Sequence, residues 1–229
     1  MNNVVIIDNM LNEDAKNWSC PKKLEARRQT IIEPYKAIFG ESIPADKQYW
    51  AMCGQCSIGG KPLEDCEIDQ VSKAGLITPN QFHGVEINPA IHKLNEQGWP
   101  DANWYCGDFY GQMKEACADE NFNPAIVNAD LISMPDRGVG YFADIMSFLS
   151  SVVDETMLVA NMVMEYKRFP DRNRDIEFVM QQLNKQDQLQ LALKNKNWTL
   201  YKKQYYAYNG TGEESKSVMG SLIFYFKKG

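Results

Sequence analysis

The stretch YWAMCGQCSIGGKP, residues 49–62, joins an apolar run to a loop that holds two adjacent glycines and a lysine. The run up to Cys53 and Gly54 has the composition of a buried strand. Because Gly59, Gly60 and Lys61 follow it, three kinds of site are possible: a phosphate-binding loop, a CxxC metal site, or the glycine turn of another nucleotide-binding fold. The class of protein depends on which of these the loop is.

The spacing of this loop excludes two of the three. A P-loop would need glycine at position 55 and Ser or Thr at 62, and the chain has Gln55 and Pro62. The glycines also lack the GxGxxG spacing of dinucleotide-binding folds. The CxxC of Cys53 and Cys56 has no second cysteine or histidine pair at zinc spacing, so we expect no metal. A different nucleotide turn and an ordinary strand-to-helix loop both stay open.

The bulk composition is that of a globular protein. The chain has 229 residues, of which 44% are hydrophobic, and a net charge of −6 from 30 acidic and 24 basic residues. This charge argues against broad, sequence-independent binding of nucleic acid, although a local basic patch stays possible. The sequence has no apolar run long enough for a membrane span and no signal peptide, so we expect no membrane association and a cytoplasmic location.

Around this loop, strand-like and helix-like segments alternate. An amphipathic helix is predicted over residues 21–39, ending at Gly40. Strands are predicted at 48–54, 81–87, 103–108, 124–130 and 155–164, and helices at 62–77, 88–98, 109–120, 140–153 and 172–194. Two aromatic-rich runs, 198–210 and 217–229, predict a closing β-hairpin.

This alternation predicts an α/β fold with a doubly wound, mostly parallel sheet and helices on both faces. A leading N-terminal helix and a C-terminal antiparallel β-hairpin complete it. We expect a single Rossmann-like domain over 1–229, with an N-terminal helical extension at 1–45 and a core at 46–229.

Two acids stand where predicted parallel strands end. Glu86 ends the second strand and Asp108, after Gly107, ends the third. Ligands of open α/β sheets lie beyond these carboxyl ends, and a carboxylate there can accept hydrogen bonds from a ribose diol or an adenine amino group. The alternative for each acid is a helix N-cap.

The whole pattern resembles the class I S-adenosylmethionine-dependent methyltransferases, in particular short, phage-like or bacterial members. The resemblance covers roughly residues 20–229 and is carried by GVEINPAIHKLN (84–95), WYCGDF (104–109) and VMGSLIFYFKK (218–228). It implies a seven-stranded sheet of order 3-2-1-4-5-7-6 and S-adenosylmethionine as cofactor. It also implies that the cofactor-binding residues are Cys53, Gly54, Gln55, Glu86, Ile87, Gly107, Asp108, Phe109 and Asn128.

Within the resemblance, IVNADLISMP (126–135) lines the reaction site, with Asp130 as general base and Asn128 as an orienting group. The alternative is that these residues only cap the loop after a buried strand. Pro135 and the basic residues Lys167, Arg168 and Arg172 are candidates for substrate binding. A solvated helix start is the alternative for the basic cluster.

The sequence departs from the family at the first strand, where no acid occurs until Glu64, and it lacks the D/N-P-P-Y/F motif and the Pro-Cys pair of DNA methyltransferases. The leading hypothesis is a methyltransferase, with nucleic acid as the favoured acceptor and a small molecule or protein still open. The alternative is a catalytically degenerate methyltransferase fold that binds a nucleotide or a protein partner as a scaffold. A nicotinamide-dependent oxidoreductase is disfavoured by the glycine spacing and the closing hairpin.

Overall fold

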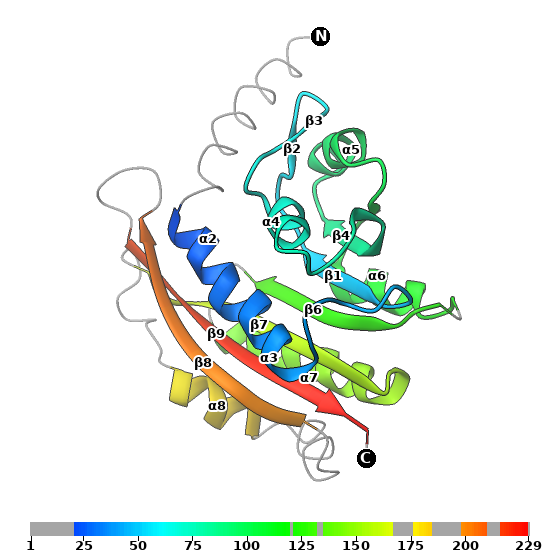
Figure 1. Ribbon diagram of the computed structural model, residues 1–229. Coiled ribbons are helices and arrows are strands. Elements are labelled where there is room, and N and C mark those ends of the chain that lie inside the picture. The colour runs from blue at the N-terminus through cyan, green and yellow to red at the C-terminus, as the bar shows by residue number, and fades with distance from the viewer. Residues whose placement is uncertain are drawn as a thin grey trace.

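A computed structural model describes residues 21–119, 121–131, 135–166, 176–184, 198–209 and 216–228. Its main element is a seven-stranded sheet of order β5-β4-β1-β6-β7-β9-β8 (Figure 1). Counted along the chain within this sheet, the order is 3-2-1-4-5-7-6, so the predicted topology is confirmed. The first five strands pair in parallel, and β9 pairs antiparallel with both β7 and β8.

The strands of the sheet are β1 (Gln48–Met52), β4 (Phe82–Glu86), β5 (Asn103–Cys106), β6 (Pro124–Leu131), β7 (Glu155–Tyr166), β8 (Trp198–Asn209) and β9 (Lys216–Lys227). Every residue of β4 is buried, as are the first six of β6. Central strands of a parallel sheet are covered on both faces, which is why even their polar residues His83, Glu86 and Asn128 are buried.

Helices cover both faces of the sheet, as predicted. The leading helix, made of α2 (Pro21–Arg27), η1 (Arg28–Ile32) and α3 (Glu33–Ile38), shares one apolar core with α4 (Glu67–Lys73). On the opposite face α6 (Phe109–Ala116), α7 (Pro135–Val152) and α8 (Ile176–Asn184) share the other core. The 3-10 turn η2 (Pro79–Gln81) leads into β4, and α5 (Pro89–Gly98) connects β4 to β5.

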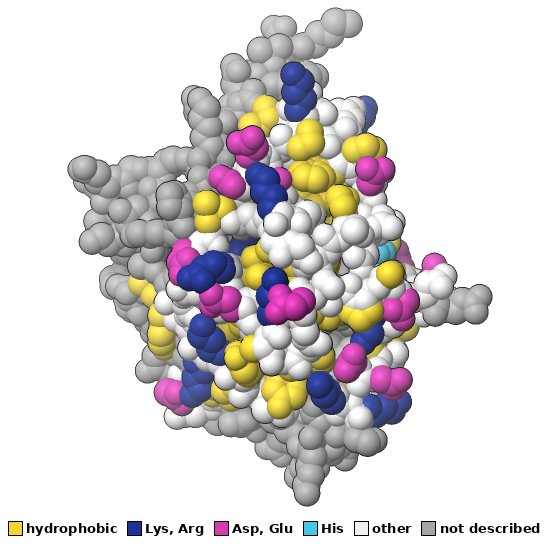
Figure 2. All heavy atoms as spheres, viewed as in Figure 1, with side chains coloured by type: hydrophobic (Ala, Val, Ile, Leu, Met, Phe, Trp, Pro, Cys, Tyr) yellow, Lys and Arg dark blue, Asp and Glu magenta, His cyan; other side chains and the backbone are white. Residues whose placement is uncertain are grey.

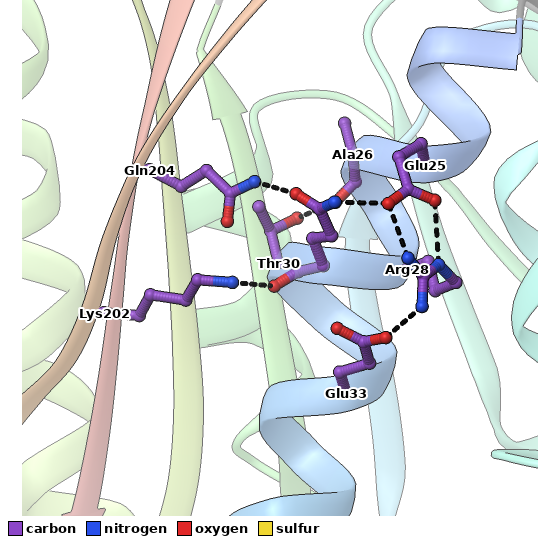
Figure 3. A network of polar contacts seen from close by, with 8 residues as sticks. Glu25, Ala26, Arg28, Thr30, Glu33, Lys202 and Gln204 are labelled. Atoms are coloured by element: carbon purple, nitrogen blue, oxygen red, sulfur yellow. Dashed lines mark hydrogen bonds and ion pairs between the residues drawn. The ribbon is translucent and has the colours of Figure 1, made fainter.

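The leading helix is not the regular α-helix that the sequence predicted. Its middle segment, η1, is a π-helix in which the Glu33 N–H bonds to the Arg28 carbonyl. Pro34, which has no N–H, follows directly and withholds a donor from this stretch. The wider turn leaves the Gln29 carbonyl without its α-helical partner, and Lys202 Nζ on β8 donates to it at 3.2 Å (Figure 3). The helix ends as predicted before Gly40, whose φ is 123°.

The predicted helix at 62–77 was wrong over its first residues. A short antiparallel ribbon, β2 (Ser57–Ile58) and β3 (Lys61–Pro62), precedes it, and α4 begins only at Glu67. Gly59 and Gly60 have φ values of 55° and 73°, the left-handed pair that a two-residue hairpin turn requires. At the other helices, α7 begins at Pro135, five residues earlier than predicted. Only 176–184 of the helix predicted at 172–194 lies within the described residues.

Candidate functional site

A pocket of about 460 Å³ lies at the carboxyl ends of β1, β4, β5 and β6. Its volume is in the range of small-molecule sites, which run from roughly 300 to 1,000 Å³. Strands from one edge of an open α/β sheet converge here, as the topology requires. The lining residues are Met52, Cys53, Gly54, Val85, Glu86, Ile87, Asn88, Ile91, Gly107, Asp108, Phe109 and Asp130.

Glu86 ends β4 with its side chain in this pocket. The residue is only 8% exposed, and its Oε1 accepts a hydrogen bond from the Asn88 N–H at 2.8 Å. Burial raises the pKa of this carboxyl group, while the backbone N–H groups of Asn88 and Ile87 lower it. The next residue, Ile87, is 75% exposed at the pocket rim. The pocket thus pairs one buried acceptor with an uncovered apolar side chain.

Asp108 is both the N-cap of α6 and a lining residue of the pocket. Its Oδ2 accepts from the Gly111 N–H at 2.7 Å, and its Oδ1 accepts from the Tyr141 hydroxyl at 3.1 Å. The Tyr141 oxygen accepts in turn from the Tyr110 N–H at 2.9 Å. The capping interpretation is therefore confirmed, and the same carboxylate faces the pocket.

Asn95 on α5 fixes the loop that follows β1. Its fully buried side chain donates from Nδ2 to the Gly54 carbonyl at 3.0 Å and accepts the Cys56 N–H at 2.7 Å. Trp99 adds a bond from its indole N–H to the Cys56 carbonyl at 2.8 Å. A phosphate-binding loop needs free backbone N–H groups, and here α5 occupies one of them. Sequence reasoning missed Asn95, although an amide in the helical pattern of an apolar face was a signal.

The cysteines of this loop are structural. Burial raises the pKa of the Cys53 thiol, and the hydrogen bond to Cys53 raises that of Cys56 well above its ordinary value. Both groups are therefore thiols at neutral pH and poor nucleophiles or ligands. Among the residues that the structure describes, no group of three or more His, Cys, Asp or Glu can hold a metal ion.

Gln55 lies beside the main pocket, outside its lining. Its Nε2 donates to the Ser57 carbonyl at 2.8 Å, which braces the loop from inside. It lines a separate cavity of about 20 Å³ together with Arg27, Cys66, Glu67 and other residues.

Asp130, near the end of β6, lines the same pocket. Its Oδ1 is buried and has no hydrogen-bond partner within the described part of the chain. Burial raises the pKa of this carboxyl group, against the opposing effect of Lys23 and Arg27. A carboxylate of this kind is suited to accept a proton from a bound molecule.

Asn128, two residues earlier on β6, lies away from the main pocket in a buried chain of side-chain hydrogen bonds. Its Nδ2 donates to Glu67 Oε1 at 2.8 Å and its Oδ1 accepts from Asn161 Nδ2 at 2.9 Å. Ser221 Oγ donates to Asn161 Oδ1 at 2.5 Å, and the Tyr49 hydroxyl donates to Glu67 Oε1 at 2.8 Å. This series of hydrogen bonds links β1, α4, β6, β7 and β9 beneath the pocket.

Glu67 and Arg27 were missed by the sequence analysis. Burial raises the pKa of Glu67, while Arg27, Asn128 and Tyr49 lower it. Arg27 lies 3.8 Å from Glu67 and donates to the Asp65 carbonyl at 3.1 Å and to Gln70 Oε1 at 2.9 Å. A glutamate on the inward face of a predicted helix was a signal, but Arg27 had none because its partners are about 40 residues away.

The remaining candidates are only partly described. Pro135 is the first residue of α7. Lys167, Arg168 and Arg172 lie outside the described residues. Within the residues that the structure describes, no helix has the length and apolar character needed to cross a membrane.

The strand order 3-2-1-4-5-7-6 is the one that the methyltransferase resemblance implied. The chain has the class I methyltransferase fold. No protein-family model matches the sequence, and no curated protein matches it either.

Solved methyltransferase structures are similar to the chain at low sequence identity. A TehB-like SAM-dependent methyltransferase from Corynebacterium glutamicum is 14% identical, over 96% of this chain and 99% of its own, with a TM-score of 0.47. The N-methyltransferase NodS from Bradyrhizobium japonicum is 8% identical, over 91% and 99%, with a TM-score of 0.45. An O-methyltransferase from Bacillus cereus, solved with SAH, is 8% identical, over 91% and 99%, with a TM-score of 0.44.

Proposed function

We propose that the protein is a methyltransferase that uses S-adenosylmethionine. The observation that carries the proposal is the convergence of three carboxylates, Glu86, Asp108 and Asp130, on one pocket at the carboxyl edge of a methyltransferase-type sheet. Each acid has a structural explanation by itself. Three of them around one pocket of ligand size make a binding site the better account.

The lining residues fit the cofactor by their chemistry. The Glu86 carboxylate would accept hydrogen bonds from the ribose diol, and Asp108 would accept the adenine amino group. Ile87, exposed at the rim, and Phe109, only 2% exposed, would supply apolar contacts to the adenine ring. Cys53 and Gly54 at the end of β1 would lie against the methionine part.

Bound S-adenosylmethionine would supply an activated methyl group, and its transfer to the acceptor atom would leave the electron pair of the carbon–sulfur bond on sulfur. Asp130 would take the proton that the acceptor atom loses, for which its raised pKa suits it. Asn128, held by Glu67 and Asn161, would act at a distance by keeping β6 and the Asp130 carboxylate in place.

Nucleic acid stays one proposed acceptor, with a small molecule or protein as the others. The basic residues that favoured nucleic acid, Lys167, Arg168 and Arg172, lie outside the described residues. On the face with α2, α3 and α4, basic and acidic side chains of the described residues are interspersed (Figure 2). Such a surface does not favour a nucleic-acid backbone over a small molecule.

Calorimetric titration tests the cofactor proposal directly. We expect S-adenosylmethionine and S-adenosylhomocysteine to bind with micromolar affinity and NAD not to bind. Glu86→Ala should weaken binding of both ligands by roughly 100-fold, because it removes two hydrogen bonds to a carboxylate. Glu115→Ala, which removes an exposed carboxylate on α6, is the matched control. Failure of the folded protein to bind either ligand would refute the proposal.

One observation favours the alternative of a degenerate methyltransferase fold acting as a scaffold. Asn95 occupies the Gly54 carbonyl and the Cys56 N–H, so two backbone groups of the cofactor loop are already bonded. A scaffold would keep its binding partner in Glu86→Ala, whereas an enzyme would lose cofactor affinity and methyl transfer together.

A further inference from the structure

A third cavity lies next to the main pocket, larger than the one beside Gln55 but smaller than the main pocket. Its volume is about 40 Å³, enough for about one small functional group or bound water. It lies between the leading helix and the strands β6 and β7, and its polar lining residues are Lys23, Arg27, Thr30, Glu67, Asn128, Asp130 and Asn161. Asp130 also lines the main pocket, so one carboxylate borders both spaces.

Most polar groups around this inner cavity are already satisfied. Asn128 bonds to both Glu67 and Asn161, and Arg27 bonds to the loop and to α4. Asp130 Oδ1 is the exception: it is buried and has no partner within the described residues. Buried acceptors in native proteins are nearly always paired. The Asp130 carboxylate, at the border of the two spaces, therefore lacks an N–H or O–H donor.

The charges around the cavity narrow the class of donor. Two cations, Lys23 and Arg27, face two anions, Glu67 and Asp130. Because these charges balance, neither a cation nor an anion is favoured at the cavity over a neutral group. A neutral group that carries N–H or O–H, such as a carboxamide, an amino group on a heterocycle or a hydroxyl, meets the requirement without adding charge.

The roof of the cavity limits how much of a molecule can enter. Ala26, Thr30 and Ile31 of the leading helix form this roof. Lys202 on β8 holds the helix at the Gln29 carbonyl, and Gln204 contacts the Gln29 side chain (Figure 3). Only the reacting end of an acceptor can fit under a roof held in this way.

We propose that the inner cavity is the acceptor subsite and that it takes a neutral group bearing a proton on nitrogen or oxygen. This inference rests on the proposed function. The acceptor atom donates a hydrogen bond to Asp130 and, on methyl transfer, bonds to the methyl carbon as the carbon–sulfur bond breaks with its electrons on sulfur. The proton that the acceptor atom loses moves to the Asp130 carboxylate, which balances the step.

Two methionines can report by NMR on binding in each cavity separately. Met52 lines the main pocket and Met219, 3% exposed, lines the inner cavity. In protein labelled with carbon-13 at the methionine methyls, the two signals are assigned by Met→Leu substitutions. S-adenosylhomocysteine should shift Met52 first. At saturating S-adenosylhomocysteine, acetamide should then shift Met219, and the isosteric acetate and acetamidinium should not.

Two variants test whether the acetamide shift of Met219 arises in the inner cavity. Ala26→Leu fills the inner cavity and should abolish the acetamide shift of Met219, whereas Ala37→Leu, the same change at an exposed position of α3, should leave it intact. Asp130→Asn removes the carboxylate with little change of shape. It should lower the affinity for acetamide, measured from the Met219 shift, by roughly tenfold. This second variant keeps the test valid where Ala26→Leu does not fold.

The outcomes separate the two proposals. If S-adenosylhomocysteine shifts Met52 but acetamide leaves Met219 unchanged, the acceptor inference fails and the proposed function stands. If acetate or acetamidinium shifts the Met219 signal as much as acetamide does, the inference that the acceptor group is a neutral donor is overturned. A shift of Met219 by S-adenosylhomocysteine alone would assign the inner cavity to the cofactor and refute an acceptor subsite. If Met52 does not respond to S-adenosylhomocysteine, the proposed function itself fails.

Discussion

Asn95 shows how one buried side chain sets the shape of a loop. Asn95→Ala would leave the buried Cys56 N–H and the partly buried Gly54 carbonyl without their Asn95 partner. We expect a loss of about 2 to 4 kcal/mol in the free energy of unfolding, measured by urea denaturation. Gln97→Ala, which removes an exposed amide from the same helix, should change stability by less than about 0.5 kcal/mol. If the two variants lost the same free energy of unfolding, Asn95 would not be the residue that holds the loop.

His83 makes the stability of the protein depend on pH. Its ring stacks on Trp50 at 4.9 Å, its Nδ1 lies 3.0 Å from the Tyr105 hydroxyl, and burial lowers its pKa to about 4. The unfolded chain takes up the proton near the ordinary pKa of about 6.5, whereas the folded chain does not. The stability contribution is therefore complete above pH 6.5 and falls by about 3 kcal/mol as the pH drops toward 4.

The variant His83→Gln, whose side chain does not titrate, tests whether His83 causes this dependence of stability on pH. We expect its unfolding free energy, measured in urea between pH 4 and 7, to vary less with pH than that of the wild type, even though the variant is less stable overall. An unchanged slope would mean that other groups cause the pH dependence.

At the element scale, α5 and the β2–β3 ribbon approach each other so closely that glycine is required between them. A Cβ on Gly98 would lie 2.3 Å from Ser57 Cβ, whereas a Cβ on Gly140 in α7 would meet nothing within 4 Å. Gly98→Ala should destabilise by about 1 to 3 kcal/mol through steric overlap. Gly140→Ala should stabilise by about 0.5 to 1 kcal/mol through helix propensity. Urea midpoints that move in the same direction would argue against this close contact.

The elements that sequence predicted well are those with a strong local signal. The apolar runs of β1, β4 and β6 and the cap at Asn88, whose Oδ1 accepts the Ala90 N–H, are encoded in neighbouring residues. The β2–β3 ribbon was missed because two residues a strand leave no period to detect. The π-turn was missed because its register depends on Pro34 and on Lys202, which is far away in sequence.

The residues of the candidate site also fall into those that the sequence could predict and those that it could not. Glu86, Asp108 and Asp130 were predicted, since topology alone brings the carboxyl ends of parallel strands together. Arg27, Glu67 and Asn161 could not be placed, because a buried side-chain network depends on contacts between elements distant in sequence. The sequence therefore predicted the main pocket but carried no sign of the inner cavity.

At the scale of the whole molecule, cofactor binding should stabilise the fold against heat. A ligand at 100 times its dissociation constant adds about 2.7 kcal/mol to the free energy of unfolding. For a chain of this length we expect S-adenosylhomocysteine to raise the melting temperature by roughly 5 to 10 °C, measured by calorimetry. The same concentration should raise it by less than about 2 °C in Glu86→Ala. A wild-type melting temperature that is insensitive to the ligand would contradict the cofactor proposal.

The position of β9 between β7 and β8 has a consequence for synthesis on the ribosome. The chain makes β8 first, yet among the strands of the described residues β8 pairs with β9 alone. While β9 is still inside the exit tunnel, the nascent protein carries β8 without a neighbouring strand and β7 with one side open. The sheet can close only after translation has passed β9, and until then the open backbone edges of β7 and β8 can pair with other strands.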